Sequence, residues 1–286
     1  MRPANIVTSV ADVLAGIGIS GFFLQDHFQI SHGWPVFLLC ISTIGLYGGG
    51  VVFNDVFDAK LDAVERPERP IPSGVVTVSE ATILGCLLLV AGVAAAALWN
   101  VYSGLIALTI SIAALVYDKW GKHHDILGPV NMGLCRGLNL LLGVSIYLPS
   151  LNYSWYLAFV PIIYIASITM ISRGEVHGGR RKTLYFAMAL YLVVTSLILY
   201  FSWERKTLLL TLLFLVPFCW MIMKPLAEAI REPAGKNIGK AVKAGIIGLI
   251  LMDASWASAF GAWYLAVIIL LLLPLSIYLS RLFAVT

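Results

Sequence analysis

Residues 54–70 read NDVFDAKLDAVERPERP, and this stretch decides how the chain is interpreted because it is far more polar than its surroundings. Of the whole chain, 60% is hydrophobic and only 12% is charged, yet acidic and basic residues crowd this segment directly after an apolar run. Asn54, Asp58 and Asp62 are spaced four residues apart. On a helix such residues lie on one face, with a drift of about 40° per step. The run therefore predicts a helix that leaves an apolar environment carrying a row of oxygen ligands.

The composition predicts an integral membrane protein. A soluble globular chain has about a quarter of its residues charged, whereas this chain of 286 residues has 12% and a mean hydropathy of +0.91. The apolar run at residues 6–24 is interpreted as the first spanning helix, because no small-residue cleavage site follows it. The cysteines lie singly in apolar runs, so neither a disulfide framework nor a cysteine metal site is expected.

Ten segments approach the roughly 20 apolar residues that a membrane-spanning helix needs. They are continuously apolar and do not alternate, which favours helices over a barrel. The predicted fold is all-α in one domain spanning residues 1–286, with nine or ten transmembrane helices depending on whether the last apolar region divides near Gly261. The spans are residues 4–24, 34–57, 77–99, 102–118, 127–149, 153–172, 183–202, 206–223, 239–259 and 262–281.

The basic residues predict the orientation of these spans. With ten spans, sixteen of the nineteen Lys and Arg residues fall in loops on one side of the membrane, and only Arg205 and Lys206 fall on the other. Positive loops remain in the cytoplasm. The N-terminus and the stretch at residue 54 are therefore expected on the cytoplasmic side of a membrane. Nothing in the pattern points to nucleic acid.

The opening stretch predicts a site for Mg²⁺ and a phosphate group. Mg²⁺ is typically held by one or two carboxylates, with water and substrate phosphate oxygens in its other positions. Asn54, Asp58 and Asp62 supply such ligands, and Asp55 is a neighbouring candidate. Arginine is a natural phosphate partner, and the loop that follows carries two candidates, Arg66 and Arg69. An ordinary solvated loop with charge pairs is the alternative.

These residues carry a resemblance to a known family. Asn54-xxx-Asp58-xxx-Asp62 at the end of the second span resembles the first aspartate-rich motif of the UbiA superfamily of intramembrane prenyltransferases. Three further stretches are similar to family motifs, and the chain looks closest to the bacterial branch called EboC-like, which implies a bacterial inner membrane as its location. These stretches are Tyr117-Asp118-Lys119 with Lys122, Asn131 with Arg136-Gly137, and the run from Gly179 through Lys182 to Leu184.

The resemblance implies a helical bundle, usually of nine helices, whose cavity opens sideways to lipid. It implies Mg²⁺-dependent transfer of a prenyl group from a prenyl diphosphate to an acceptor, which the sequence does not identify. It also implies a set of diphosphate-binding candidates, with membrane lipids as further partners. This set comprises Arg66, Arg69, Tyr117, Lys119, Lys122, Asn131, Arg136, Arg173, Lys182 and, at the start of the first span, Asn5.

The second aspartate motif of the family is altered in this chain. Its two aspartates correspond to Ile171 and Glu175, with Arg173 and His177 close by. Three alternatives are open. Glu175, with His177, still holds a second Mg²⁺; or Arg173 replaces that metal as counter-charge to the diphosphate; or the site no longer catalyses. The last alternative makes the chain a non-catalytic isoprenoid or lipid carrier.

Three charged residues lie deep inside predicted spans, where such residues are functional candidates. Arg136 either reaches the diphosphate from below or forms an interhelical pair. Asp12, in the first span, is expected to hydrogen-bond between helices and is also a candidate for orienting the acceptor, and Asp253 lies in the ninth span. A faint repeat, Pro3-Ala-Asn5 and Pro129-Val-Asn131, suggests two related halves, about 1–125 and 126–224, followed by C-terminal helices at 239–281.

Overall fold

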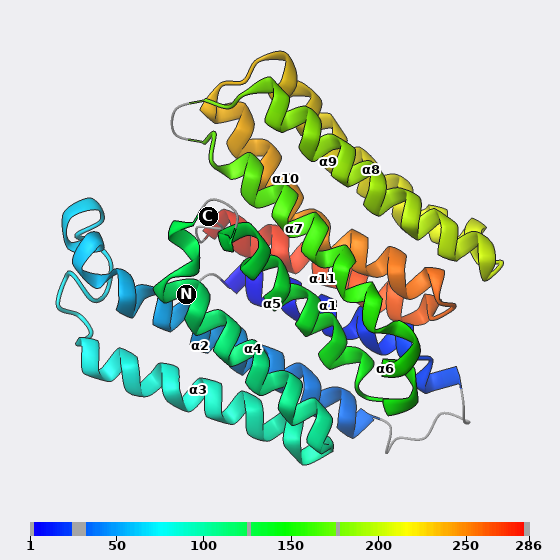
Figure 1. The fold of residues 1–286 in the computed structure, drawn as a ribbon, viewed down its shortest axis with the longest axis horizontal. Coiled ribbons are helices and arrows are strands. Elements are labelled where there is room, and N and C mark those ends of the chain that lie inside the picture. Colours follow the sequence, from blue (N-terminus) through cyan, green and yellow to red (C-terminus); the bar gives the residue numbers. More distant parts are fainter. Residues whose placement is uncertain (1–2, 25–32, 125–126, 176–177, 283–286) are drawn as a thin grey trace.

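The structure is a computed structural model that describes residues 3–24, 33–124, 127–175 and 178–282. Within these residues every regular element is helical, as predicted for an all-α protein. The long helices run roughly along one another as an elongated bundle (Figure 1). They are α1 (Pro3–Ser20), α2 (Gly33–Glu65), α3 (Val78–Trp99), α4 (Val101–Lys119), α5 (Leu127–Val144), α7 (Phe159–Ser172), α8 (Arg181–Glu204), α9 (Leu208–Arg231), α10 (Gly235–Ala259) and α11 (Trp263–Leu282).

Local sequence explains where several helices begin and end. Thr77 and Glu80 form a capping box at the start of α3, with the Thr77 N–H donating to Glu80 at 2.8 Å. The Asn100 side chain accepts a hydrogen bond from the Ser103 N–H at 2.8 Å and so caps α4. Gly261, at φ +88°, makes the turn between α10 and α11. The predicted division of the C-terminal region into two helices is therefore present.

The predicted span 127–149 is shorter in the structure. Helix α5 ends at Val144, and a separate short helix, α6 (Leu148–Ser154), begins after three intervening residues. Pro149 lies in the first turn of α6, where proline is tolerated, whereas inside a continuing α5 it would remove a hydrogen bond. A 3-10 turn, η4 (Trp155–Ala158), then leads into α7.

Eight helical segments of the described chain are long and apolar enough to cross a membrane. They account for eight of the ten predicted spans. The other two predicted spans correspond to α5 and α10, which have similar lengths but carry charged and amide side chains. The predicted count of nine or ten spanning helices agrees with this arrangement.

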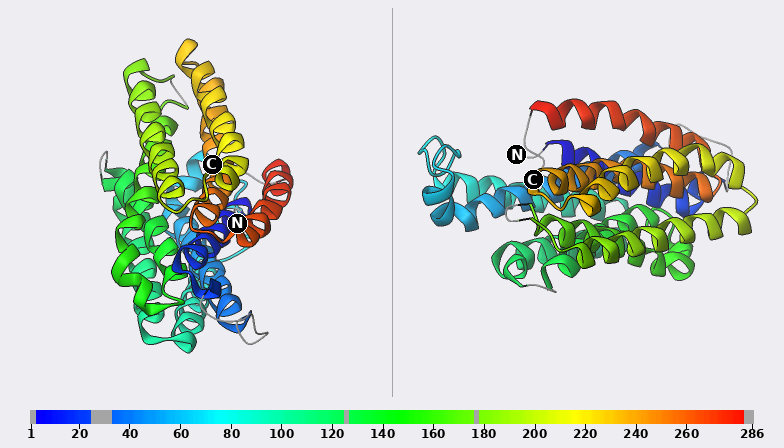
Figure 2. Two further views of the ribbon diagram at one scale, coloured as in Figure 1. Left: turned by 90° about the vertical axis from the view of Figure 1, so that its right-hand side faces the viewer. Right: turned by 90° about the horizontal axis from the view of Figure 1, so that it is seen from above.

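Contacts between the helices form a closed ring. Going round it, α1 packs on α2, α2 on α3, α3 on α4, α4 on α5, α5 on α7, and α7 on α8. Helices α9 and α10 continue the ring, and α10 returns to α1. Helix α11 lies outside it against α1 and α10, as the views in Figure 2 also show. Because α1 also packs on α5, the ring is divided into two lobes (Figure 1).

The α1–α5 contact is unusually close because both helices present glycine. A Cβ at Gly16 would lie 2.1 Å from the Leu140 carbonyl oxygen, and one at Gly143 would lie 2.1 Å from the Val13 carbonyl oxygen. Small residues allow helix backbones to approach in this way in membranes. The close approach brings the polar side chains of α1 and α5 next to one another.

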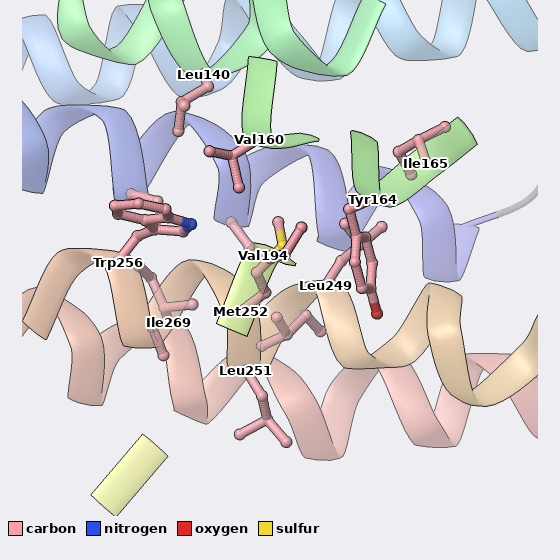
Figure 3. Packing of buried hydrophobic residues seen from close by; sticks show 14 of the residues in the cluster. Leu140, Val160, Tyr164, Ile165, Val194, Leu249, Leu251, Met252, Trp256 and Ile269 are labelled. Atoms are coloured by element: carbon pink, nitrogen blue, oxygen red, sulfur yellow. The ribbon is translucent and has the colours of Figure 1, made fainter. Parts of the chain in front are cut away.

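The main apolar core lies between α1, α7, α10 and the neighbouring helices (Figure 3). Tyr164 and Trp256 are among its largest fully buried side chains. The Tyr164 hydroxyl donates to the Gly245 carbonyl oxygen at 2.8 Å, so its polar atom is satisfied inside the core. This core fixes α7 against α10, two of the helices that form the apolar wall of the cavity described next.

Candidate active site

A cavity of about 450 Å³ opens between α1, α2, α4, α5, α7 and α10. We call its outer polar lining the rim, defined as Asn54, Asp58, Tyr117, Asp118 and Glu175. We call its inner polar lining the floor, defined as Ser9, Thr43, Tyr47, Arg136 and Asn139. Since a helix rises 1.5 Å per residue, Tyr47 lies about 10 Å along α2 from Asn54. Between the two, apolar side chains form the wall, among them Ile110, Ile165, Ile168, Val242 and Ile246.

The polar end of α2 divides into two faces. Asn54 and Asp58 line the cavity. Asp62 instead accepts a hydrogen bond from Arg69 at 2.7 Å, and Asp55 lies 3.3 Å from the same guanidinium. Helix geometry explains this division, because Asp62 is rotated about 80° from Asn54 but only about 20° from Asp55. Arg69 therefore pairs with both Asp55 and Asp62, and only the first two members of the predicted row face the cavity.

Two side chains from the end of α4 and the following turn contact the Asn54–Asp58 face. The Asn54 amide donates to Asp118 Oδ1 at 2.9 Å, and the Lys122 ammonium donates to Asp58 Oδ1. Asp118 is 5% exposed and belongs to the rim, although the sequence analysis singled out only its neighbours Tyr117 and Lys119. The sequence feature that could have identified Asp118 is its position as an acidic residue, next to Tyr117, at the end of an otherwise apolar span.

The altered second motif places one carboxylate at the cavity. Ile171 is buried in the core at 1% exposure, whereas Glu175, just beyond α7, belongs to the rim. Partial burial raises the pKa of Glu175 above its ordinary value. Arg173 is exposed at the C-terminal end of α7. His177 lies outside the described residues.

The remaining predicted binding residues fall into two groups. Tyr117 and Asn5 line the cavity, and Asn131 joins α5 to α4. With its amide turned to satisfy both groups, Asn131 accepts from the Tyr117 N–H at 3.1 Å and donates to the Ala113 carbonyl oxygen at 3.3 Å. In the second group the side chains are exposed and are not among the described lining residues. They are Lys119, whose ammonium lies 4.5 Å from the centre of the Trp120 ring, Arg66 and Lys182.

The floor is organised around Arg136. Its guanidinium donates to Asp12 at 2.7 Å and to the Thr8 hydroxyl at 2.6 Å, and it lies 5.6 Å from the centre of the Tyr47 ring. The Asn139 amide donates to Asp12 at 3.0 Å and to the Ser9 carbonyl oxygen at 2.8 Å. Of the two predicted roles for Arg136, the structure thus contains the interhelical pair.

The rim has the donor chemistry that Mg²⁺ requires, although not as a preformed cage. In the described part of the chain, no three acidic, histidine or cysteine side chains lie close enough to hold a metal by themselves. Mg²⁺ needs only one or two carboxylates when substrate phosphates complete its coordination. This requirement is met by the carboxylates of Asp58 and Asp118. The side-chain amide oxygen of Asn54 and the carboxylate of Glu175 line the same cavity.

Comparison with solved structures supports the fold. The chain superposes on a UbiA homologue from Aeropyrum pernix with a TM-score of 0.72 at 17% identity, over 89% of this chain and 98% of that one. A UbiA homologue from Archaeoglobus fulgidus bound to DMAPP and Mg²⁺ gives a TM-score of 0.62 at 16% identity, over 87% and 96%. The predicted UbiA-type bundle is therefore confirmed.

Sequence relatives carry the comparison further. The digeranylgeranylglyceryl phosphate synthase of Methanothrix thermoacetophila is 32% identical over 214 residues, which are 70% of this chain and 77% of that protein. The synthase of the same name from Sulfurisphaera tokodaii is 28% identical over 62% of this chain and 70% of that protein. Residues 14–237 match the UbiA prenyltransferase family. The chain therefore belongs to the UbiA prenyltransferase family and is an integral membrane prenyltransferase, as its motifs predicted.

Proposed function

We propose that this protein transfers a prenyl group from a prenyl diphosphate to a hydroxyl-bearing acceptor in a Mg²⁺-dependent reaction. One observation carries the proposal. A single cavity joins a rim of oxygen ligands, Asn54, Asp58, Asp118 and Glu175, to an apolar wall on α4, α7 and α10. A diphosphate fits the rim and an isoprenoid chain fits the wall. The solved homologue bound to DMAPP and Mg²⁺ and the curated prenyltransferase relatives support the same reaction class.

The reaction follows from the arrangement of a polar rim next to an apolar wall. The allylic C–O bond of the donor breaks, its electron pair leaves with the diphosphate, and the acceptor oxygen forms the new bond to the prenyl carbon. The acceptor proton passes to the released diphosphate. Bound Mg²⁺ would supply positive charge to the leaving diphosphate, with Asp58, Asp118, Asn54 and Glu175 as the residues that would hold it. Lys122, next to Asp58, adds a cation to the rim, and the apolar wall excludes water from the reacting carbon.

The orientation of the protein in the membrane, with the rim on the cytoplasmic side, is part of the same proposal. The rim is built from the ends of α2, α4 and α7, which are the ends that the positive loops place in the cytoplasm. We propose that the diphosphate enters from that side and that membrane lipid surrounds the wall helices. The bacterial branch suggested by the motifs stays a prediction, since the relatives described above are archaeal.

Pyrophosphate release tests the proposal directly. Purified protein in nanodiscs is incubated with prenyl diphosphates of several lengths and a lipid extract as acceptor source, with Mg²⁺ or with EDTA. We expect release that EDTA abolishes and that Asp58→Asn lowers by about 100-fold, as expected when a group that stabilises the leaving charge is lost. Glu68→Gln, the same chemical change at an exposed position of the same stretch, should retain the wild-type rate.

The carrier alternative gives a different result. If the protein binds prenyl diphosphates but releases no pyrophosphate at any chain length, the altered second motif marks a carrier and the enzymatic proposal fails. If release continues unchanged in Asp58→Asn, the reaction uses another part of the cavity.

A further inference from the structure

We infer that the floor binds the polar group of the acceptor and that this group is neutral, a hydroxyl or polyol, rather than a carboxylate or a phosphate. The inference rests on the proposed function and narrows its substrate class. It comes from the charges that surround Arg136. An isolated arginine inside a membrane protein attracts an anion, but this guanidinium already has an anionic partner, Asp12, within the protein.

The contacts of Arg136 leave it little capacity for a second anion. One of its terminal nitrogens donates to Asp12 Oδ2 at 2.7 Å, and the other donates to Thr8 at 2.6 Å. Asp12 is fully buried and does not line the cavity, so it sits behind the guanidinium as a fixed counter-ion. The arginine and the aspartate form one buried pair with no net charge.

A second acidic side chain lies near this pair. Asp253 on α10 is 1% exposed, and neither of its oxygens has a hydrogen-bond partner among the described residues. Because a buried carboxyl without a partner is strongly disfavoured in its charged form, Asp253 contributes a neutral group. Asp12 alone therefore balances the Arg136 guanidinium, and the cluster carries no surplus of positive charge for a ligand.

An anionic ligand at the floor would add negative charge to this set. In a medium of low dielectric constant, bringing like charges together is costly, and a buried charge without its own partner is strongly disfavoured. A hydroxyl group avoids that cost. The unused guanidinium N–H groups and the Tyr47 hydroxyl can donate to it, and the oxygens of Thr43 and Ser9 can accept from it.

The spacing of rim and floor suits a small acceptor head. The two sets are separated by about 10 Å along α2, so a glycerol-sized group on the floor can present one hydroxyl toward the donor carbon. That hydroxyl oxygen forms the new C–O bond while the donor C–O bond breaks. The floor thus selects and orients the acceptor, and the rim retains the diphosphate.

A pair of acceptors that differ only in charge tests the inference. Radiolabelled geranylgeranyl diphosphate is supplied with either a prenylglycerol or the corresponding prenylglyceryl phosphate, and kcat/KM is measured for each. We expect the neutral acceptor to be favoured by about 10-fold or more, equivalent to about 1.4 kcal/mol. In parallel, the labelled product formed from a lipid extract is passed over an anion-exchange resin, where we expect it to flow through as a neutral compound.

Two variants connect the preference to the cluster. Asp12→Asn removes one negative charge with little change of shape and should move the acceptor ratio toward the phosphate by about 10-fold. Asp253→Asn replaces a neutral carboxyl by a neutral amide and should leave the ratio unchanged. The wild-type acceptor pair and the product charge remain decisive if a variant does not fold. A wild-type preference for the phosphate, an anionic product, or a ratio that the folded Asp12→Asn variant does not change would overturn the inference. Absence of pyrophosphate release with every acceptor would instead contradict the proposed function.

Discussion

The rim and the floor of the cavity both contain ion pairs, but the two are built differently. At the rim, Lys122 and Asp58 have side-chain exposures of 15% and 20%, and Arg69 keeps its contacts with Asp55 and Asp62 beside the cavity. At the floor, Arg136 and Asp12 have exposures of 9% and 0% and are further bonded to Thr8 and Asn139. The rim pair is reached by solvent, whereas the floor pair is enclosed by helices.

This difference assigns the two pairs different roles. A partly exposed pair contributes little to stability and can exchange its partners for a ligand. A buried pair is costly to break, because removal of one partner leaves an uncompensated charge. We therefore expect substitutions at the rim to lower activity with little loss of stability, and substitutions at the floor to lower stability first.

Replacement of Arg136 should give the largest effect on stability. Arg136→Met leaves Asp12 buried without a cation and should lower the free energy of unfolding by about 3–5 kcal/mol. Titration with SDS in mixed micelles measures this change. A loss below about 1 kcal/mol would show that Asp12 is already neutral in the folded protein and would remove the charge argument for the floor.

The double variant Arg136→Met with Asp12→Asn provides the matched control. Because it removes both charges, it should recover much of the stability that the single variant loses, giving a clear interaction energy in a double-mutant cycle. If the two changes were simply additive, the side chains would not be coupled.

Replacement of Lys122 should give the opposite pattern at the rim. Lys122→Met removes a cation that contacts Asp58, and hydrogen bonds to charged groups contribute about 1.5–3 kcal/mol. We expect the KM for the prenyl diphosphate to rise by about 10- to 100-fold while the unfolding free energy changes by less than about 1 kcal/mol. Lys119→Met is the control, because that ammonium lies over Trp120 at an exposed position. Equal effects of the two substitutions would mean that the rim responds only to overall charge.

The fold was accessible from sequence because hydropathy dictates it. Ten apolar runs, the polar extension after residue 54 and Gly261 between the last two helices all correspond to features of the structure. The break between α5 and α6 was the exception, where Pro149 outweighed a continuous apolar pattern. The predicted relation between two halves of the chain stays a prediction.

The site was only partly accessible from sequence. Spacing predicted Asn54, Asp58 and Asp62 on one face, but the rotation along the helix carries Asp62 away from the cavity, where it pairs with Arg69. Asp118 contacts Asn54 across 64 positions in the chain, and Asp12 reaches Arg136 across 124. Such pairings depend on how α1, α2, α4 and α5 pack, which no local pattern encodes.

The smallest expected effect concerns pH and Glu175. Burial raises the pKa of this carboxyl above its ordinary value. If the ionised form helps to hold the metal, the rate should fall as the pH drops through that raised pKa, at a higher pH than for an ordinary carboxyl. Glu175→Gln should remove this acidic limb and lower the rate near neutral pH by less than about 10-fold. Glu228→Gln, at an exposed position on α9, should leave the profile unchanged.

The contribution of Glu175 to stability should change with pH in the opposite direction to its contribution to activity. Because folding raises the pKa, the folded state binds the Glu175 proton more tightly than the unfolded state. The stabilisation is present at low pH and is lost as the pH rises through the folded pKa. Wild type should therefore lose stability over the pH range in which it gains activity, and Glu175→Gln should lose this dependence. An acidic limb that persists in Glu175→Gln would assign the titration to Asp58 or Asp118 and would separate Glu175 from metal binding.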